Sequence, residues 1–196
     1  MGVELMGDLP FMVGLDSADV WQHRDLFMVD ASIGVPGDPW IPEGQDWGLP
    51  AYAWDALDAN DLAWVRARAA AMGRLFDRFR LDHLVGYYRM YVRPRGARGS
   101  GEARWVPALE PDQIARGEKV LSTMTDAAAR VGARVIAEDL GTIPAFVRAS
   151  MQRLELPGYR VLMWEKDGDA FRDPAAYPYR SLAASGTHDT ITLATS

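Results

Sequence analysis

The chain has 196 residues, of which 48% are hydrophobic and 24% charged, a composition that supports a folded core and excludes a disordered segment. It carries 27 acidic and 21 basic side chains, so its formal charge of −6 gives no general excess of positive charge for binding nucleic acid. The absence of cysteine excludes disulfide scaffolds, cysteine nucleophiles, zinc fingers and iron–sulfur ligation.

Short apolar runs alternate along the chain with longer stretches of helical spacing. In chain order they predict a strand at 3–6, a helix over 62–76, a strand at 79–81, a helix from about 112 to 131, a strand at 135–137, a helix from 142 to 154, and strands at 159–164 and 182–184. Gly132 is expected to stop the second helix, and Thr142 is expected to cap the third, with Pro144 in its first turn.

Two long loops are predicted between these elements. Residues 34–50 contain four Gly and four Pro and are therefore expected to form neither helix nor strand. This loop carries Trp40 and Trp47, which could plug the side of the domain or stack on sugar rings. Residues 93–104 are rich in Arg and Gly and are expected to form a mobile, solvated loop.

Alternating strands and helices predict an α/β protein with a parallel sheet covered by helices. A doubly wound sheet and a (β/α)8 barrel both fit this order, but no G-x-G-x-x-G or Walker motif follows any strand. Acidic residues follow four of the strands instead, namely Asp8, Asp82, Glu138 and Asp189. Barrel enzymes build their sites from the carboxyl ends of their strands, so a barrel is favoured.

A complete barrel usually needs roughly 250 residues and eight strands, whereas about five strands are predicted. Residues 1–196 are therefore expected to form a single, incomplete catalytic barrel domain that lacks the early strands and the last strand. Unpaired strand edges predict that the isolated fragment is poorly soluble and inactive. No run of ~18 apolar residues and no signal segment is present, and with the lack of cysteine this predicts a cytoplasmic protein outside the membrane.

Arg80-Leu81-Asp82-His83 stands at the end of the predicted strand over 79–81. Because alternate side chains of a strand share a face, Arg80 and Asp82 are expected to point the same way. A cation two positions away keeps a carboxylate ionised and oriented, which a carboxylate nucleophile requires. The same two residues also fit a purely structural ion pair.

Glu138 directly follows the predicted buried strand over 135–137. A carboxyl group in such a partly apolar setting can stay protonated and serve as a general acid. The alternative is that Glu138 or Asp139 caps the following helix, although Thr142 is the better candidate for the cap.

Two of the three histidines lie beside a strand-end acid, His83 next to Asp82 and His188 next to Asp189. Both are candidate site residues, although each also fits an ordinary core or rim position. His23 has no such neighbour and is assigned no role. In the first loop, Trp47 follows hydrogen-bonding side chains, so it is expected to contact sugar.

Six short motifs occur here in the order found in amylomaltases, the 4-α-glucanotransferases of glycoside hydrolase family 77 in the α-amylase clan, and the resemblance extends over essentially the whole chain. They are Gly7-Asp8-Leu9-Pro10, Leu15-Asp16-Ser17-Ala18-Asp19-Val20-Trp21, Gly44-Gln45-Asp46-Trp47-Gly48, Phe79-Arg80-Leu81-Asp82-His83, Ala137-Glu138-Asp139-Leu140-Gly141 and Gly186-Thr187-His188-Asp189.

The resemblance implies a partial (β/α)8 barrel, roughly strands three to seven of the catalytic domain. It implies that Asp82 is the nucleophile, Glu138 the acid/base and Asp189 the third carboxylate, which stabilises the transition state. It further implies that the substrate is bound by five residues, namely Arg80, His188, Trp47, Asp8 and His83.

The implied substrates are maltodextrins and other α-1,4-glucans, and the chemistry needs no cofactor or metal. A metal-dependent barrel enzyme of the enolase or amidohydrolase kind is the alternative, because such enzymes also place acids and histidines at strand ends. Against it, His83 and His188 do not form an H-x-H motif, and the aromatic loop would have no purpose.

Overall fold

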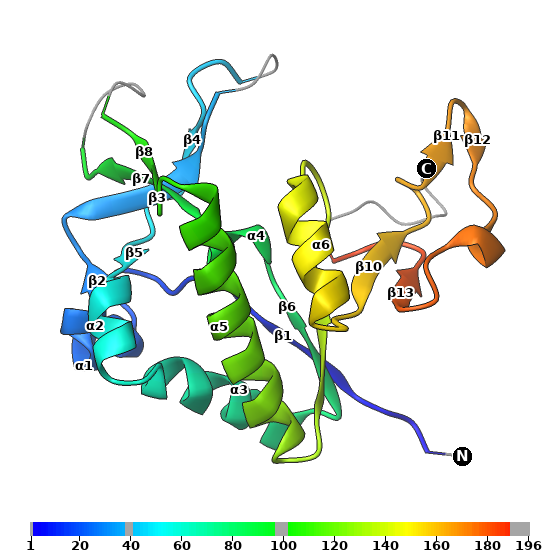
Figure 1. The fold of residues 1–196 in the computed structure, drawn as a ribbon, viewed down its shortest axis with the longest axis horizontal. Coiled ribbons are helices and arrows are strands. Elements are labelled where there is room, and N and C mark those ends of the chain that lie inside the picture. The colour runs from blue at the N-terminus through cyan, green and yellow to red at the C-terminus, as the bar shows by residue number, and fades with distance from the viewer. Residues whose placement is uncertain (1, 38–40, 97–101, 189–196) are drawn as a thin grey trace.

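The computed structural model describes residues 2–37, 41–96 and 102–188 (Figure 1). The helices are α1 (Ala18–Gln22), α2 (Trp54–Ala59), α3 (Ala63–Leu75), α4 (Val85–Tyr88), α5 (Glu110–Ala129) and α6 (Ala145–Arg153), with 3-10 turns η1 (Arg24–Leu26) and η2 (Pro174–Ala176). The strands are β1 (Met6–Leu9), β2 (Phe27–Met28), β3 (Ala31–Val35), β4 (Gln45–Asp46), β5 (Ala51–Tyr52), β6 (Arg78–Leu81), β7 (Met90–Pro94), β8 (Arg104–Val106), β9 (Arg134–Ala137), β10 (Gly158–Val161), β11 (Lys166–Asp167), β12 (Ala170–Phe171) and β13 (Ser181–Ala184).

A parallel sheet with strand order β1-β6-β9 forms the centre of the fold. Phe79 and Leu81, which share one face of β6, are fully buried. Helices α3 and α5 pack against each other and contact this sheet (Figure 1). Val120, Leu121 and Met124 of α5 are buried in the core. This core fixes the positions at which β1, β6 and β9 end.

A second parallel pair, β10 and β13, continues from the central sheet. Ala137 N donates to Pro157 O at 2.8 Å, which places the start of β10 beside the end of β9. The expected α/β class is therefore confirmed, with parallel strands that alternate with helices through much of the chain. The described strands do not close into a barrel. No helix among the described residues is long and apolar enough to cross a membrane.

An antiparallel sheet with strand order β4-β3-β7-β8 stands where the sequence predicted two loops. The prediction that residues 34–50 contain no strand is wrong, because β3 extends to Val35 and β4 pairs with it. Gly34 permits this pairing, since a Cβ atom there would lie 1.8 Å from Gln45 O. Residues 93–104 likewise begin in β7 and end in β8, and 97–101 lie outside the described residues. These strands pair with distant partners, which local composition does not indicate.

Three predicted boundaries also differ from the structure. The first strand begins at Met6 instead of residue 3, because Val3 is exposed and the buried positions come later. Helix α6 has Pro144 as its N-cap, and no side chain caps it, so the predicted role of Thr142 is wrong. The constrained φ of Pro144, −58°, already suits the entry to a helix. The strand predicted at 159–164 ends at Val161, where the chain turns.

Candidate active site

The carboxyl ends of β1, β6 and β9 gather four of the predicted site residues. Asp8 lies directly opposite Arg80 in the parallel register, while Asp82 follows β6 and Glu138 follows β9. Glu138 N donates to Leu81 O at 3.0 Å, so the backbone pairing continues to the acidic residue itself. Because neighbouring parallel strands end at the same edge, the four side chains share one site.

Arg80 stands at the centre of this cluster and contacts all three carboxylates. Its Nε and Nη2 atoms each donate to one oxygen of Asp8 at 2.8 Å, and Nη2 also donates to Asp82 Oδ1 at 3.0 Å. Its Nη1 atom lies 3.7 Å from Glu138 Oε2. The hydrogen bonds to Asp8 raise the pKa of Arg80 further above its usual value, so the guanidinium remains charged.

Glu138 is held in a setting that favours its protonated form. Burial raises the pKa of this carboxyl above its usual value, and the adjacent Asp82 carboxyl adds to the increase. The backbone N–H of His83, which donates to Glu138 Oε2 at 2.7 Å, and the Arg80 guanidinium both oppose it. The net increase gives Glu138 the property expected of a general acid.

Replacing Arg80 with methionine is expected to reduce the free energy of unfolding by about 2–4 kcal/mol. The arginine side chain is only 7% exposed, and its loss leaves three carboxylates without a shared cation, although their partial exposure reduces the cost below that of a fully buried pair. Urea denaturation at pH 7 measures the effect. The matched control is Arg66→Met, which breaks an exposed ion pair with Asp61 and should cost less than about 1 kcal/mol. Equal losses in the two variants would contradict a central role of Arg80 in stability.

The remaining predicted residues lie in neighbouring cavities, except for Asp189, which falls outside the described residues. His188 lines a cavity of about 310 Å³ together with Asp8 and Arg80. On another side, Trp47 and His83 line a cavity of about 420 Å³, and their ring centroids lie 5.0 Å apart in an edge-to-face arrangement. The structure thus places His83 and His188, the two histidines predicted to belong to the site, at the rim of the Arg80 cluster. Trp40 lies outside the described residues.

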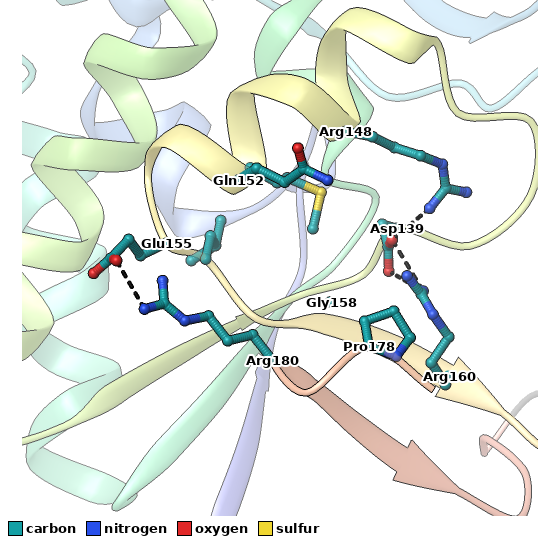
Figure 2. Close-up of a pocket in the computed structure, with 10 residues that line it drawn as sticks. Asp139, Arg148, Gln152, Glu155, Gly158, Arg160, Pro178 and Arg180 are labelled. Carbon is teal, nitrogen blue, oxygen red and sulfur yellow. Dashed lines mark hydrogen bonds and ion pairs between the residues drawn. The ribbon is translucent and has the colours of Figure 1, made fainter. Parts of the chain in front are cut away.

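Asp139, which follows Glu138, has a structural role that the sequence analysis missed (Figure 2). Its side chain is 2% exposed and accepts hydrogen bonds from Arg148 Nη1 at 2.8 Å, Arg160 Nη1 at 2.9 Å and Tyr159 N at 2.8 Å. Figure 2 shows the two arginines pointing at this carboxylate from α6 and β10. The proposal that Asp139 caps α6 is wrong, since this aspartate ties the end of β9 to both neighbouring elements.

Gly158 makes this contact possible. A Cβ atom at that position would lie 2.7 Å from Asp139 Oδ1, too close for any other residue without a shift. A cavity of about 230 Å³ lies beside the contact, and Arg180 pairs with Glu155 on its wall (Figure 2). The sequence does contain a signal for this contact. A second acid follows the buried strand, and a Pro-Gly turn leads into the next strand.

A cluster of acids at the ends of parallel strands is typical of α/β enzymes. The sequence model of the 4-alpha-glucanotransferase family, glycoside hydrolase family 77, matches residues 1–195, so the chain belongs to this family. A 4-alpha-glucanotransferase of Chlamydia pneumoniae is 35% identical over 197 residues, which cover 98% of this chain and 36% of that protein. A Thermus thermophilus 4-alpha-glucanotransferase is 35% identical over 204 residues, which cover 98% of this chain and 39% of that protein.

Solved structures agree with this assignment. An amylomaltase from Streptococcus agalactiae in complex with acarbose superposes with a TM-score of 0.77 at 28% identity, over 96% of this chain and 38% of that one. An amylomaltase from Corynebacterium glutamicum gives a TM-score of 0.81 at 27% identity, over 94% of this chain and 25% of that one. The chain therefore spans little more than a third of the length of the curated relatives it matches.

The metal-dependent alternative receives no support from these comparisons or from the site. Arg80 fills the space among Asp8, Asp82 and Glu138 where a cation would otherwise balance the carboxylates. Among the described residues, no group of three or more His, Asp or Glu side chains is placed to hold a metal ion.

Proposed function

We propose that this chain carries the catalytic carboxylates of a 4-α-glucanotransferase, which moves α-1,4-glucan segments between maltodextrins with retention of configuration. The observation that supports it is the contact of Asp82 and Glu138 with one guanidinium, at the ends of adjacent strands, in a chain of this family. Retaining enzymes of this chemistry use two carboxyl groups roughly 5–5.5 Å apart during the reaction, and here both carboxyl groups contact Arg80.

In the first step, the Asp82 carboxylate attacks the anomeric carbon of the donor while Glu138 protonates the departing glycosidic oxygen. The C1–O bond breaks, a covalent glycosyl ester with Asp82 forms, and the reducing-end segment leaves as an alcohol. The pKa of Glu138, raised by burial, keeps the required proton on this carboxyl at a higher pH than an exposed glutamate would.

In the second step, the Glu138 carboxylate takes the proton from the 4-hydroxyl of an acceptor glucan. The acceptor oxygen then attacks the anomeric carbon and displaces Asp82, which restores both the α-linkage and the starting protonation states. Asp189 stabilises the oxocarbenium charge that develops in both steps. No cofactor enters this scheme.

The surrounding residues are proposed to bind the sugars. Asp8, Arg80 and His188 bind donor hydroxyl groups, a role supported by the cavity that they share. Trp47 and His83 bind the acceptor side, where the rings stack on sugar and exclude the water that would otherwise hydrolyse the intermediate. We further propose that residues 1–196 are an incomplete (β/α)8 domain, roughly strands three to seven, of a cytoplasmic enzyme.

The test is disproportionation of maltotriose by the product of the complete reading frame that contains this chain. The expected products are glucose and maltodextrins longer than maltotriose, separated by chromatography. Isotopically labelled glucose added as an acceptor should enter the longer products. Formation of glucose and maltose alone would identify a hydrolase, and the absence of any product would overturn the proposal. We expect residues 1–196 alone to give no turnover.

A further inference from the structure

The turn between β6 and α4 contains His83, whose backbone lies against the Glu138 carboxyl. His83 has a φ of 46°, in the left-handed region that residues with a side chain seldom adopt. In this conformation its N–H donates to Glu138 Oε2 at 2.7 Å, and Leu84 N donates to Glu138 O at 3.3 Å. Unusual backbone conformations of this kind persist where the surrounding structure holds them, and they cluster at functional sites.

The ring of His83 is held on two sides by aromatic rings. Its centroid lies 5.6 Å from that of Phe11 and 5.0 Å from that of Trp47. Burial lowers the pKa of His83 below its usual value, so the imidazole is neutral at pH 7 and packs as an aromatic ring. A displacement of Trp47 would therefore remove one of the two ring contacts of His83.

The backbone of Trp47 in turn is anchored to the antiparallel sheet, whereas its ring lines a cavity. Trp47 N donates to Ile33 O at 2.9 Å, and Gly48 N donates to Asp46 Oδ1 at 3.0 Å. The hydroxyl of the buried Ser32 also donates to Asp46 Oδ1. A continuous set of contacts thus runs from the loop, through the two rings, to the backbone N–H that holds Glu138.

We propose that His83 is a positioning residue that couples Trp47, in the segment between β4 and β5, to the acid/base carboxyl of Glu138. The ring of Trp47 holds the ring of His83, and the left-handed backbone of His83 then directs its N–H at the carboxylate. A shift of Trp47, such as an acceptor sugar would cause, would therefore change the hydrogen bond to Glu138. The kinetic part of this inference rests on the proposed glucanotransferase function, whereas the contact itself does not.

Other charged groups face Glu138 and would stay in place when His83 is changed. Arg80 and Asp82 approach from the end of β6, and Asp8 lies beyond Arg80. On the opposite side, Glu138 opens onto a cavity of about 750 Å³ that is also lined by charged side chains, namely Asp139, Arg148, Arg160, Glu165 and Arg172. A change in the titration of Glu138 that is specific to His83 variants can therefore be assigned to the His83 contact.

The experiment compares three substitutions that all remove the imidazole. His83→Gly and His83→Asn retain easy access to the left-handed backbone, whereas the β-branched side chain of His83→Val opposes it. In NMR titrations of the complete gene product, the residue 83 amide proton is expected to follow the ionisation of Glu138 in the wild type, glycine and asparagine proteins. It should not do so in the valine variant, nor in Glu138→Gln.

The pH profile of kcat/KM supplies the second measurement. Losing the N–H contact removes a bond to the ionised carboxylate, so the pKa of Glu138 rises and the basic limb moves to higher pH in His83→Val. We also expect kcat/KM to fall on the order of 10- to 100-fold relative to His83→Asn, because the carboxyl loses its alignment. The glycine and asparagine variants keep the left-handed backbone but lose the ring that Trp47 contacts, so their basic limb should lie between those of the wild type and His83→Val, and their KM for the acceptor should rise.

The role of the loop is tested with Trp47→Leu against Trp21→Leu, a matched loss of an indole that is 85% exposed on α1. Only Trp47→Leu should shift the residue 83 amide signal and the basic limb. Equal behaviour of the two tryptophan variants, or a wild-type amide that ignores Glu138, would overturn the coupling even if His83→Val failed to fold. An amide that follows Glu138 in a protein without glucan transfer would support the contact and refute only the proposed function.

Discussion

Replacing Asp82 with alanine is expected to abolish glucan transfer, lowering kcat/KM on the order of 10⁴- to 10⁶-fold. The carboxylate is the proposed nucleophile, so its removal eliminates the covalent intermediate and with it the double displacement. Arg80 and Glu138 remain in the variant, and the folded structure is expected to persist because the Asp82 side chain lies at the edge of the core. Initial rates with maltotriose measure the loss.

Small nucleophiles give a sharper version of this test. In Asp82→Ala, azide is expected to replace the missing carboxylate and attack α-glucosyl fluoride directly, forming the C1–N bond as fluoride leaves, so the product should be the β-glucosyl azide. Asp126→Ala, an exposed aspartate on α5, is the control and should retain full transfer activity. Persistent transfer by Asp82→Ala, or an α-configured azide product, would remove Asp82 from the role of nucleophile.

Replacing Glu138 with glutamine is expected to slow transfer from maltotriose on the order of 10²- to 10⁴-fold. Glutamine retains the size of the side chain but cannot protonate the leaving oxygen or deprotonate the acceptor. Fluoride needs no such proton, so the first step with α-glucosyl fluoride should be far less affected. Pre-steady-state release of fluoride measures this step separately from the transfer that follows.

The pH dependence gives an independent check on Glu138. A general acid must be protonated in the free enzyme, so kcat/KM falls as the pH rises through the pKa of Glu138. Because burial raises that pKa, the basic limb should lie above the range of an exposed glutamate, and it should disappear in Glu138→Gln. Glu155→Gln, which alters an exposed pair with Arg180, should leave the limb unchanged. A basic limb that survives in Glu138→Gln would assign the proton to another group.

The parts of the site that depend on strand ends were predictable from sequence. Phe79 and Leu81 in β6, like Val135 and Ala137 in β9, are buried residues in short apolar runs, so the positions of Asp82 and Glu138 followed from the strand pattern. The ion pair between Arg80 and Asp82 followed from the two-residue period of a strand.

Other parts depend on distant contacts that no local pattern contains. Arg80 binds Asp8 through both carboxylate oxygens only because β1 pairs with β6 in one register, across 72 residues of sequence. The antiparallel sheet joins β3 to β7. Both strands run into segments rich in Gly, Pro or Arg, a composition that is typical of loops. The buried contacts of Asp139 require Gly158 and two arginines from other elements to converge.

The bidentate contact between Asp8 and Arg80 links assembly of the sheet to assembly of the proposed catalytic centre. A slip of β1 by one residue would put Gly7 or Leu9 opposite Arg80 and turn the Asp8 carboxylate to the other side of the sheet. In the misaligned form the guanidinium would lose its main partner. That form would therefore be less stable than the correctly aligned one. Correct strand alignment and the charge balance of the Arg80 cluster are thus reached in a single folding event.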